Sequence, residues 1–378
     1  MTTLDAEPGV ALAEAPAGRS LWADAWGRLR ANRAAMTSFV VLGLIALACI
    51  FGPMLSPHAY DQVYQEYVKI PPSLTPYPRE QDLLEELDRT LRRTGVSVAE
   101  SRIEDRTLVV ELTSEAPIDP RISRYLERSD SFASAVIDIP AEGATTATAT
   151  VQINRQLFLF GTESNGRDLM TRVFVGGRIS LMIGLLATGV SLLIGVAYGA
   201  IAGYLGGAVD NAMMRLVDIL YSLPFMFFVI LLMVFFGRNV VLVFIAIGAI
   251  EWLDMARIVR GQTLSLKRQE YVQAAHAMGV GARGILRRHV IPNALGPVVI
   301  YMTLMVPKVI LLESFLSFPG LGVQEPLTSW GTLIADGAKN LQQALWMLVF
   351  PAVFLVATLM CLNFIGDGLR DALDPKDR

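Results

Sequence analysis

Cysteine and histidine are scarce in this chain of 378 residues. Only Cys49 and Cys361 are present, each inside an apolar block, and the three histidines are His58, His276 and His289. No CxxC pair and no Cys/His cluster occurs, so the sequence predicts neither a zinc site nor a disulfide framework. We expect both cysteines to behave as small buried hydrophobic residues.

Charge is also low. Asp, Glu, Lys and Arg make up 18% of the chain, whereas soluble domains contain about 25%. The mean hydropathy is +0.46, and the apolar residues fall in uncharged blocks of about 20, the length that crosses a hydrocarbon core about 30 Å thick. The sequence therefore predicts an all-α polytopic membrane protein. Residues 1–20 are polar and lack a cleavable signal, so the apolar run from Met36 is interpreted as an uncleaved first span.

Six spans are expected. The fourth is short and ends at Glu251 and Asp254, so we expect it to continue as a helix beyond the membrane. Pro224 is expected to kink the third span. The predicted spans are 36–55, 179–204, 216–236, 240–255, 296–318 and 344–365.

Basic residues indicate the orientation. They gather before the first span, between the fourth and fifth spans and after the sixth, which an even number of spans places on one side. Because short cytoplasmic loops are rich in Lys and Arg, segment 1–35, loop 257–295 and tail 370–378 are predicted to be cytoplasmic. The basic residues are Arg28, Arg30, Arg33, Arg257, Arg260, Lys267, Arg268, Arg283, Arg287, Arg288, Arg370, Lys376 and Arg378.

Segment 56–165 is then extracytoplasmic and interrupts a membrane core whose other five spans lie in 166–369. Residues 58–158 carry 17 acidic and 11 basic side chains. Leucines at helical spacing in 80–93 and alternating stretches at 107–113, 134–139 and 147–153 predict a small α+β domain inserted between the first two spans. It shows no catalytic constellation, and a structural or docking role is favoured over ligand handling.

Loop residues 270–292 predict two short helices. Tyr271, Ala274, Ala275 and Met278 share one helical face by their spacing, and Gly279 is suited to a left-handed helix end. Pro292 is expected to end the second helix before the next span. Small and adaptable apolar residues suit a helix that docks on a partner. By periodicity alone, packing of the loop against its own chain is equally compatible.

The same stretch carries a family resemblance. EYVQAAHAMG at 270–279, Ile285 and IPN at 291–293 resemble the EAA coupling loop of ABC-type import permeases. Three further motifs resemble the dipeptide/oligopeptide group of the second-subunit (DppC/OppC-like) type, and together the motifs bracket 21–55 and 159–378 but not the insertion. These motifs are GTESNGRD at 161–168, FPGLGVQEP at 318–326 with SWG at 329–331, and GDGLRDALDP at 366–375.

The resemblance implies a six-helix permease of the type I ABC importer kind in the bacterial inner membrane. Its implied partners are a homologous (DppB/OppB-like) permease subunit, one or two ATPases that hold ATP and Mg, an extracytoplasmic substrate-binding protein and membrane lipid. Nucleic acid is not expected as a partner. The implied coupling residues are Glu270, Tyr271, Gln273, Ala274, Ala275, Met278, Gly279, Ile285 and Pro292.

Gln273 departs from the family pattern, which commonly has Glu before the Ala-Ala pair. The change removes one potential charge pair with the ATPase, yet we expect coupling to survive. Peptide is the cargo that the resemblance implies, with nickel, a sugar or another small solute as alternatives. No Gly-x-x-x-x-Gly-Lys-Ser/Thr loop occurs in the chain, so we expect ATP hydrolysis on a partner and no cofactor or metal on this chain.

Glu313, Asn363 and Trp330 are candidates for the translocation pathway. A structural role is favoured for Glu313, which is expected near the outer surface, and interhelical hydrogen bonding for Asn363. Trp330 is expected on a short re-entrant or interfacial helix at the channel mouth. Two other classes remain open. A membrane-embedded enzyme would need convergent catalytic groups, and a sensor would need a cytoplasmic output domain.

Overall fold

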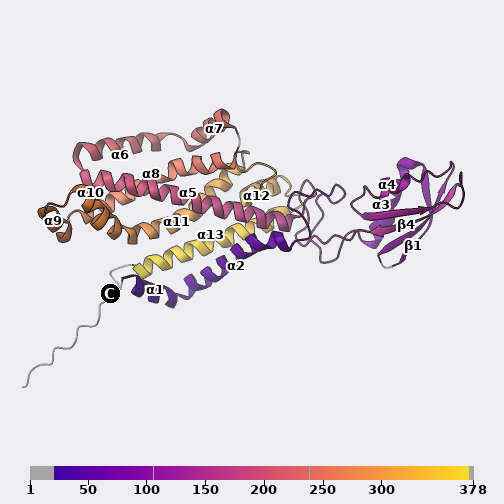
Figure 1. The fold of residues 1–378 in the computed structure, drawn as a ribbon, viewed down its shortest axis with the longest axis horizontal. Coiled ribbons are helices and arrows are strands. Elements are labelled where there is room, and N and C mark those ends of the chain that lie inside the picture. Colours follow the sequence, from indigo (N-terminus) through magenta and orange to yellow (C-terminus); the bar gives the residue numbers. More distant parts are fainter. Residues whose placement is uncertain (1–20, 105, 238, 374–378) are drawn as a thin grey trace, which may run out of the picture.

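The computed structural model describes residues 21–104, 106–237 and 239–373, so residues 1–20 and 374–378 of the predicted cytoplasmic segments lie outside the described residues. A long helical bundle carries a separate sheet unit at one end, and helices α9 and α10 lie at the other (Figure 1). The bundle consists of α1 (Leu21–Ala31), α2 (Arg33–Leu55), α5 (Leu169–Leu205), α6 (Gly207–Ser222), α7 (Phe225–Phe236), α8 (Val240–Leu266), α11 (Ile291–Ser317), α12 (Trp330–Lys339) and α13 (Trp346–Leu373).

The sheet unit lies between α2 and α5 in the sequence. It consists of α3 (Glu80–Leu91), η1 (Arg92–Thr94), β1 (Val96–Glu104), β2 (Thr107–Ser114), α4 (Ile122–Leu126), β3 (Phe132–Asp138) and β4 (Thr146–Ile153). All neighbouring strands are antiparallel, in the order β1-β2-β4-β3, with Val110 opposite Ala149.

One face of this sheet is apolar because every second residue points to the same side. Leu108, Val110 and Leu112 of β2 are buried there against leucines of α3. The sequence predicted the helix and the strands at 107–113, 134–139 and 147–153, but not β1. Leu84 of the predicted leucine face is 42% exposed.

Four helical segments are long and apolar enough to cross a membrane, namely α2, α5, Ala282–Ser317 and α13, and a fifth candidate is the bent pair α6–α7. The pair turns by 80° at Pro224, where the sequence predicted a kink, and the helix is interrupted there rather than bent. Leu223 before it has an extended backbone, as expected for a residue that precedes proline. Helix α8 runs on to Leu266 and is not among the candidates.

Helix α5 begins ten residues before the predicted span. Asp168 caps it, because its carboxylate accepts hydrogen bonds from the Thr171 backbone (2.9 Å) and hydroxyl (2.6 Å). On the α8 side, α5 presents Gly195, Gly199 and Gly203, and a Cβ at Gly199 would overlap the Ala256 carbonyl oxygen. The glycines therefore let the two helix backbones approach closely.

The two ends of the described chain lie together. Ala25 and Leu29 of α1 pack against Ala372 at the end of α13, at the same end of the bundle as α9 and α10 (Figure 1).

Candidate functional site

The candidate coupling site is the segment that joins α8 to α11. It contains α9 (Glu270–Ala277), α10 (Ala282–Ile285) and the π-helical turn η2 (Leu286–Val290). The segment is fastened to the end of α5, where the Lys267 ammonium donates to the Tyr204 carbonyl oxygen at 2.6 Å and lies 5.4 Å from the centre of the Tyr204 ring. The site is therefore anchored to the bundle and is not a free loop.

Helix α9 has one buried and one exposed face. Val272 and Ala275 are buried with Tyr204, Ile285 and Val290 in a small apolar cluster. Ala275 was expected on the contact face, and Ile285 was assigned to the coupling loop by resemblance. The structure buries both side chains, which fix α9 to its own chain. Helical spacing had assigned Ala275 to the contact face. The residue type could not correct this, because alanine is compatible with either a buried or an exposed side of a helix.

The exposed face keeps the other three predicted contact residues. Tyr271 is 41% and Met278 77% exposed, and Ala274 between them is also exposed. Exposed aromatic and methionine side chains around a small residue are typical of a protein-binding surface. The face is held in place by its own apolar underside, so it is formed before any partner arrives.

Gly279 ends α9 as predicted. Its φ is +83°, and the bonds Val280 N–H to Ala275 O (3.1 Å) and Gly279 N–H to His276 O (3.0 Å) form a Schellman motif. Val280 then packs on the cluster beneath α9. The turn thus satisfies the last carbonyl groups of α9 and aims the chain into α10.

Pro292 does not end the second helix, contrary to expectation. Helix runs without a break over Ala282–Ser317. The turn before Pro292 is π-helical, with the Ile291 N–H bonded to the Leu286 carbonyl. This local change in helical geometry accommodates proline, which has no N–H to donate, inside a continuing helix. The part of the coupling segment that follows the Gly279 turn, α10 and η2, is therefore continuous with the α11 helix.

Gln273 is exposed, and its amide donates to the Arg268 carbonyl oxygen at 3.2 Å. A glutamate carboxylate at this position would have no proton to give to that oxygen. Glu270 lies in the first turn of α9, where a carboxylate interacts favourably with the helix dipole. The departure at residue 273 is thus compatible with the observed loop.

Glu313 is fully buried, not near solvent as expected. Its carboxylate accepts hydrogen bonds from the hydroxyls of Ser329 (2.6 Å), Ser317 (3.2 Å) and Ser180 (3.3 Å). Ser180 also accepts the backbone N–H of Trp330. The group therefore joins α5, α11 and the start of α12.

Trp330 begins the predicted short helix, α12, but its side chain is fully buried. Its indole N–H donates to the Val173 carbonyl of α5 at 2.9 Å, so in this conformation it touches no surface that a solute could reach. Asn363 is exposed on α13, and no hydrogen bond of its side chain is recorded among residues 21–104, 106–237 and 239–373. The expected interhelical bond within this chain is thus not seen.

Two charged clusters were missed. Lys308 of α11 lies 2.9 Å from a Glu251 oxygen and 2.7 Å from an Asp254 oxygen of α8. At the sheet end of the bundle, Glu163 pairs with Arg167 and, at 2.8 Å, with Arg172. Arg167 also reaches Glu325 at 2.6 Å. For the Lys308 cluster the only signal was a charge within an apolar run, and for the other it was the polar motif GTESNGRD at 161–168, which does not show which charges pair.

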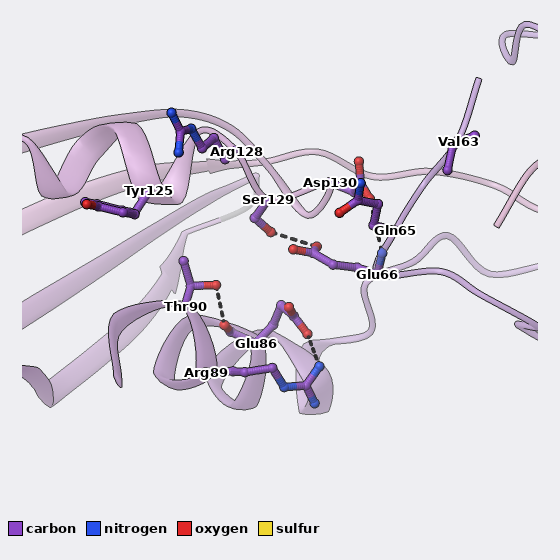
Figure 2. A pocket seen from close by; sticks show the side chains of 10 residues that line it. All are labelled: Val63, Gln65, Glu66, Glu86, Arg89, Thr90, Tyr125, Arg128, Ser129 and Asp130. Atoms are coloured by element: carbon purple, nitrogen blue, oxygen red, sulfur yellow. Dashed lines mark hydrogen bonds and ion pairs between the residues drawn. The ribbon is translucent and has the colours of Figure 1, made fainter. Parts of the chain in front are cut away.

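The sheet unit carries a groove of about 780 Å³ beside the 63–66 segment (Figure 2). Glu66 and Glu86 face each other across it, and Glu66 accepts the Ser129 hydroxyl at 2.7 Å. Burial, reinforced by the charge of Glu66, raises the pKa of Glu86, and burial raises the pKa of Asp130. In the part of the chain that the structure describes, no group of three His, Cys, Asp or Glu residues is arranged to hold a metal ion.

Comparison with known proteins identifies the family. Residues 195–378 match the model of the binding-protein-dependent transport system inner membrane component, and residues 20–85 match the N-terminal TM domain of oligopeptide transport permease C. The Escherichia coli K12 oligopeptide transport system permease protein OppC is 48% identical over 361 residues, 96% of this chain and 93% of that protein.

Other relatives cover less of the chain. Haemophilus influenzae OppC is 61% identical over 58% of this chain and 70% of that protein, and the Bacillus subtilis dipeptide permease DppC is 47% identical over 58% and 69%. A solved inward-facing MetNI methionine ABC transporter matches 55% of this chain and 98% of its own, with a TM-score of 0.47 at 18% identity. The chain therefore belongs to the binding-protein-dependent transport inner-membrane components, in their oligopeptide permease C group.

Proposed function

We propose that this chain is one permease subunit of an ATP-driven importer that carries peptides across the bacterial inner membrane by alternating access. The relatives described as oligopeptide and dipeptide permeases support peptide as cargo. A homologous permease subunit, ATPases that bind ATP and Mg, and an extracytoplasmic binding protein complete the assembly. This chain supplies the membrane path and carries no catalytic step.

Six spans complete this topology. They are α2, α5, the bent pair α6–α7, α8, Ala282–Ser317 and α13. Helix α8 is counted although its apolar stretch contains the charged residues Glu251, Asp254 and Arg257. The coupling end of the bundle carries α1, the end of α13 and the basic loop (Figure 1). Positive charge on that side supports a cytoplasmic location for both termini and an extracytoplasmic one for the sheet unit.

The observation that carries the proposal is the two-faced helix α9. Its buried face fixes the helix to α5, α10 and η2, and its exposed face offers Tyr271, Ala274 and Met278 to an ATPase cleft. A rigid loop of this kind transmits displacement, because its underside cannot slide without exposing the apolar cluster.

Ala274→Arg tests the proposal. Ala274 is exposed, so arginine there leaves the fold of this chain intact and obstructs only a partner. In proteoliposomes with the complete transporter, we expect loss of peptide import and of ATPase stimulation by loaded binding protein. Ala141→Arg, at an exposed alanine between β3 and β4, is the matched control and is expected to retain both. Normal stimulation in Ala274→Arg would overturn the assignment.

A further inference from the structure

A charged triad lies inside the membrane-spanning part of the bundle. The Lys308 ammonium of α11 contacts the carboxylates of Glu251 (2.9 Å) and Asp254 (2.7 Å) of α8. Lys308 is nine residues from the Ser317 end of α11, and Glu251 and Asp254 are 11 and 14 residues from Val240. At about 1.5 Å per residue these positions are about 14–21 Å from the helix ends, close to the middle of a core about 30 Å thick.

The triad is open on one side. The side chain of Lys308 is 48% exposed and that of Asp254 32%, whereas Glu251 is 3% exposed. Arg257 lies three residues beyond Asp254 on α8, is itself exposed and pairs with Asp218 of α6 at 2.9 Å. Exposed charges therefore recur along this face from mid-bundle toward the coupling segment.

The outer face of α2 differs sharply. Between residues 39 and 55 its exposed large side chains are all apolar: Phe39, Val40, Val41, Leu44, Leu47, Ile50, Phe51, Met54 and Leu55. Such a face suits lipid. Charges at the same depth are costly in hydrocarbon and are found where they face water or another polar group. The two faces of the bundle thus have different surroundings.

We propose that the Glu251–Asp254–Lys308 triad lines the water-filled translocation path and is a contact point for the peptide backbone. The inference rests on the proposed function and assigns a site within it. Two carboxylates against one ammonium leave a net negative charge, which favours the peptide's ammonium and N–H groups. Lys308 has three N–H donors and gives one to Asp254, while Glu251 contacts the ammonium as an ion pair, so donor capacity is left for a peptide carbonyl.

The three side chains of the triad differ in exposure, and this gives them different roles. Glu251 is buried and holds the ammonium in place from behind, so it is a positioning residue. Asp254 and Lys308 are the groups that reach the open side and touch the cargo. Loss of the Lys308 charge would leave the Glu251 carboxylate without its counter-ion, which makes Asp254 the safer position for substitution.

The test is labelling of single cysteines in the complete transporter, in a background with Cys49 replaced by serine and Cys361 by alanine. Asp254→Cys, the safer substitution, is the deciding variant, and Lys308→Cys is included where it assembles at the wild-type level; both are treated with a charged, membrane-impermeant methanethiosulfonate. Leu44→Cys and Val353→Cys are controls, because these residues are 61% and 58% exposed on apolar helix faces. We expect the triad cysteines to react at least about tenfold faster, since a charged reagent enters water but not hydrocarbon.

Peptide provides the second readout. A transported tripeptide, added with its binding protein and ATP, should slow labelling at residue 254, an effect that a purely structural ion pair would not produce. Triad cysteines that react no faster than the controls, with or without nucleotide, would show that lipid or the second permease covers this face, and would overturn the proposal. Peptide import by the unlabelled wild-type complex is measured alongside. If it is present while the triad is unreactive, only the triad assignment fails, and if it is absent, the proposed function fails.

Discussion

The turn after α9 allows backbone strain to be separated from packing. Gly279 has a φ of +83°, and a Cβ added there would meet nothing within 4 Å. Gly279→Ala therefore introduces no clash, and its cost is the left-handed conformation itself, about 1–2 kcal/mol for an L-residue. That strain weakens the two Schellman bonds that close α9.

Hydrogen exchange of the assembled transporter measures this cost. A local destabilisation of about 1–2 kcal/mol raises the open fraction about 5- to 30-fold, so the amides of residues 279 and 280, which donate the two Schellman bonds, should exchange faster by that factor. Gly279→Asn should be milder, because asparagine tolerates this conformation. Gly261→Ala is the matched control. It also has open space, but it lies within α8, where alanine favours the helix. Equal acceleration in both alanine variants, or none in Gly279→Ala, would refute the reasoning.

Further predictions concern the bundle and the sheet unit. Gly199→Ala should lower the melting temperature of the purified chain, since its Cβ would overlap the Ala256 carbonyl and overpacking costs about 1–3 kcal/mol; Gly189→Ala, with open space on the same helix, should not. Trp330→Phe should lower the free energy of unfolding by about 0.5–1.5 kcal/mol through the lost bond to Val173, and Trp330→Ala by about 3–5 kcal/mol. Equal losses for the two variants in urea unfolding would contradict this. The raised pKa of Glu86 means that the folded state binds more protons than the unfolded one, so its contribution to stability falls as pH rises through and above the ordinary carboxyl range near pH ~4. Glu86→Gln should therefore flatten the pH dependence of melting of the sheet unit, and an unchanged profile would exclude this group.

Periodicity predicted the elements whose apolar residues repeat regularly. It located α3, three strands and the main apolar helices, and local chemistry identified the Gly279 helix end. The start of α5 was missed because its first turns contain Arg172 and Arg178, which look exposed in the sequence. In the fold Arg172 pairs with Glu163, and Arg178 donates to backbone carbonyls of α2.

The candidate site was only partly predicted, because helical spacing shows which residues share a face but not what that face packs against. Exposed Tyr271, Ala274 and Met278 follow from helical spacing, whereas the inward position of Ala275 depends on Tyr204 and Ile285, which lie elsewhere in the sequence. The partners of Lys308 are more than 50 residues away, and those of Glu313 come from three different segments. Contacts of this kind are set by the packing of helices and leave no local pattern.

The continuity of Ala282–Ser317 has a mechanical consequence. Its 36 residues, at about 1.5 Å each, form a rod about 54 Å long. Arg283 at one end, Lys308 along its length and Glu313 near the other end are carried on this single rod. A tilt imposed on the coupling end therefore displaces Lys308 of the triad and the Glu313 carboxylate together. The turn of weakest helical geometry, η2, lies between the coupling end and these two groups.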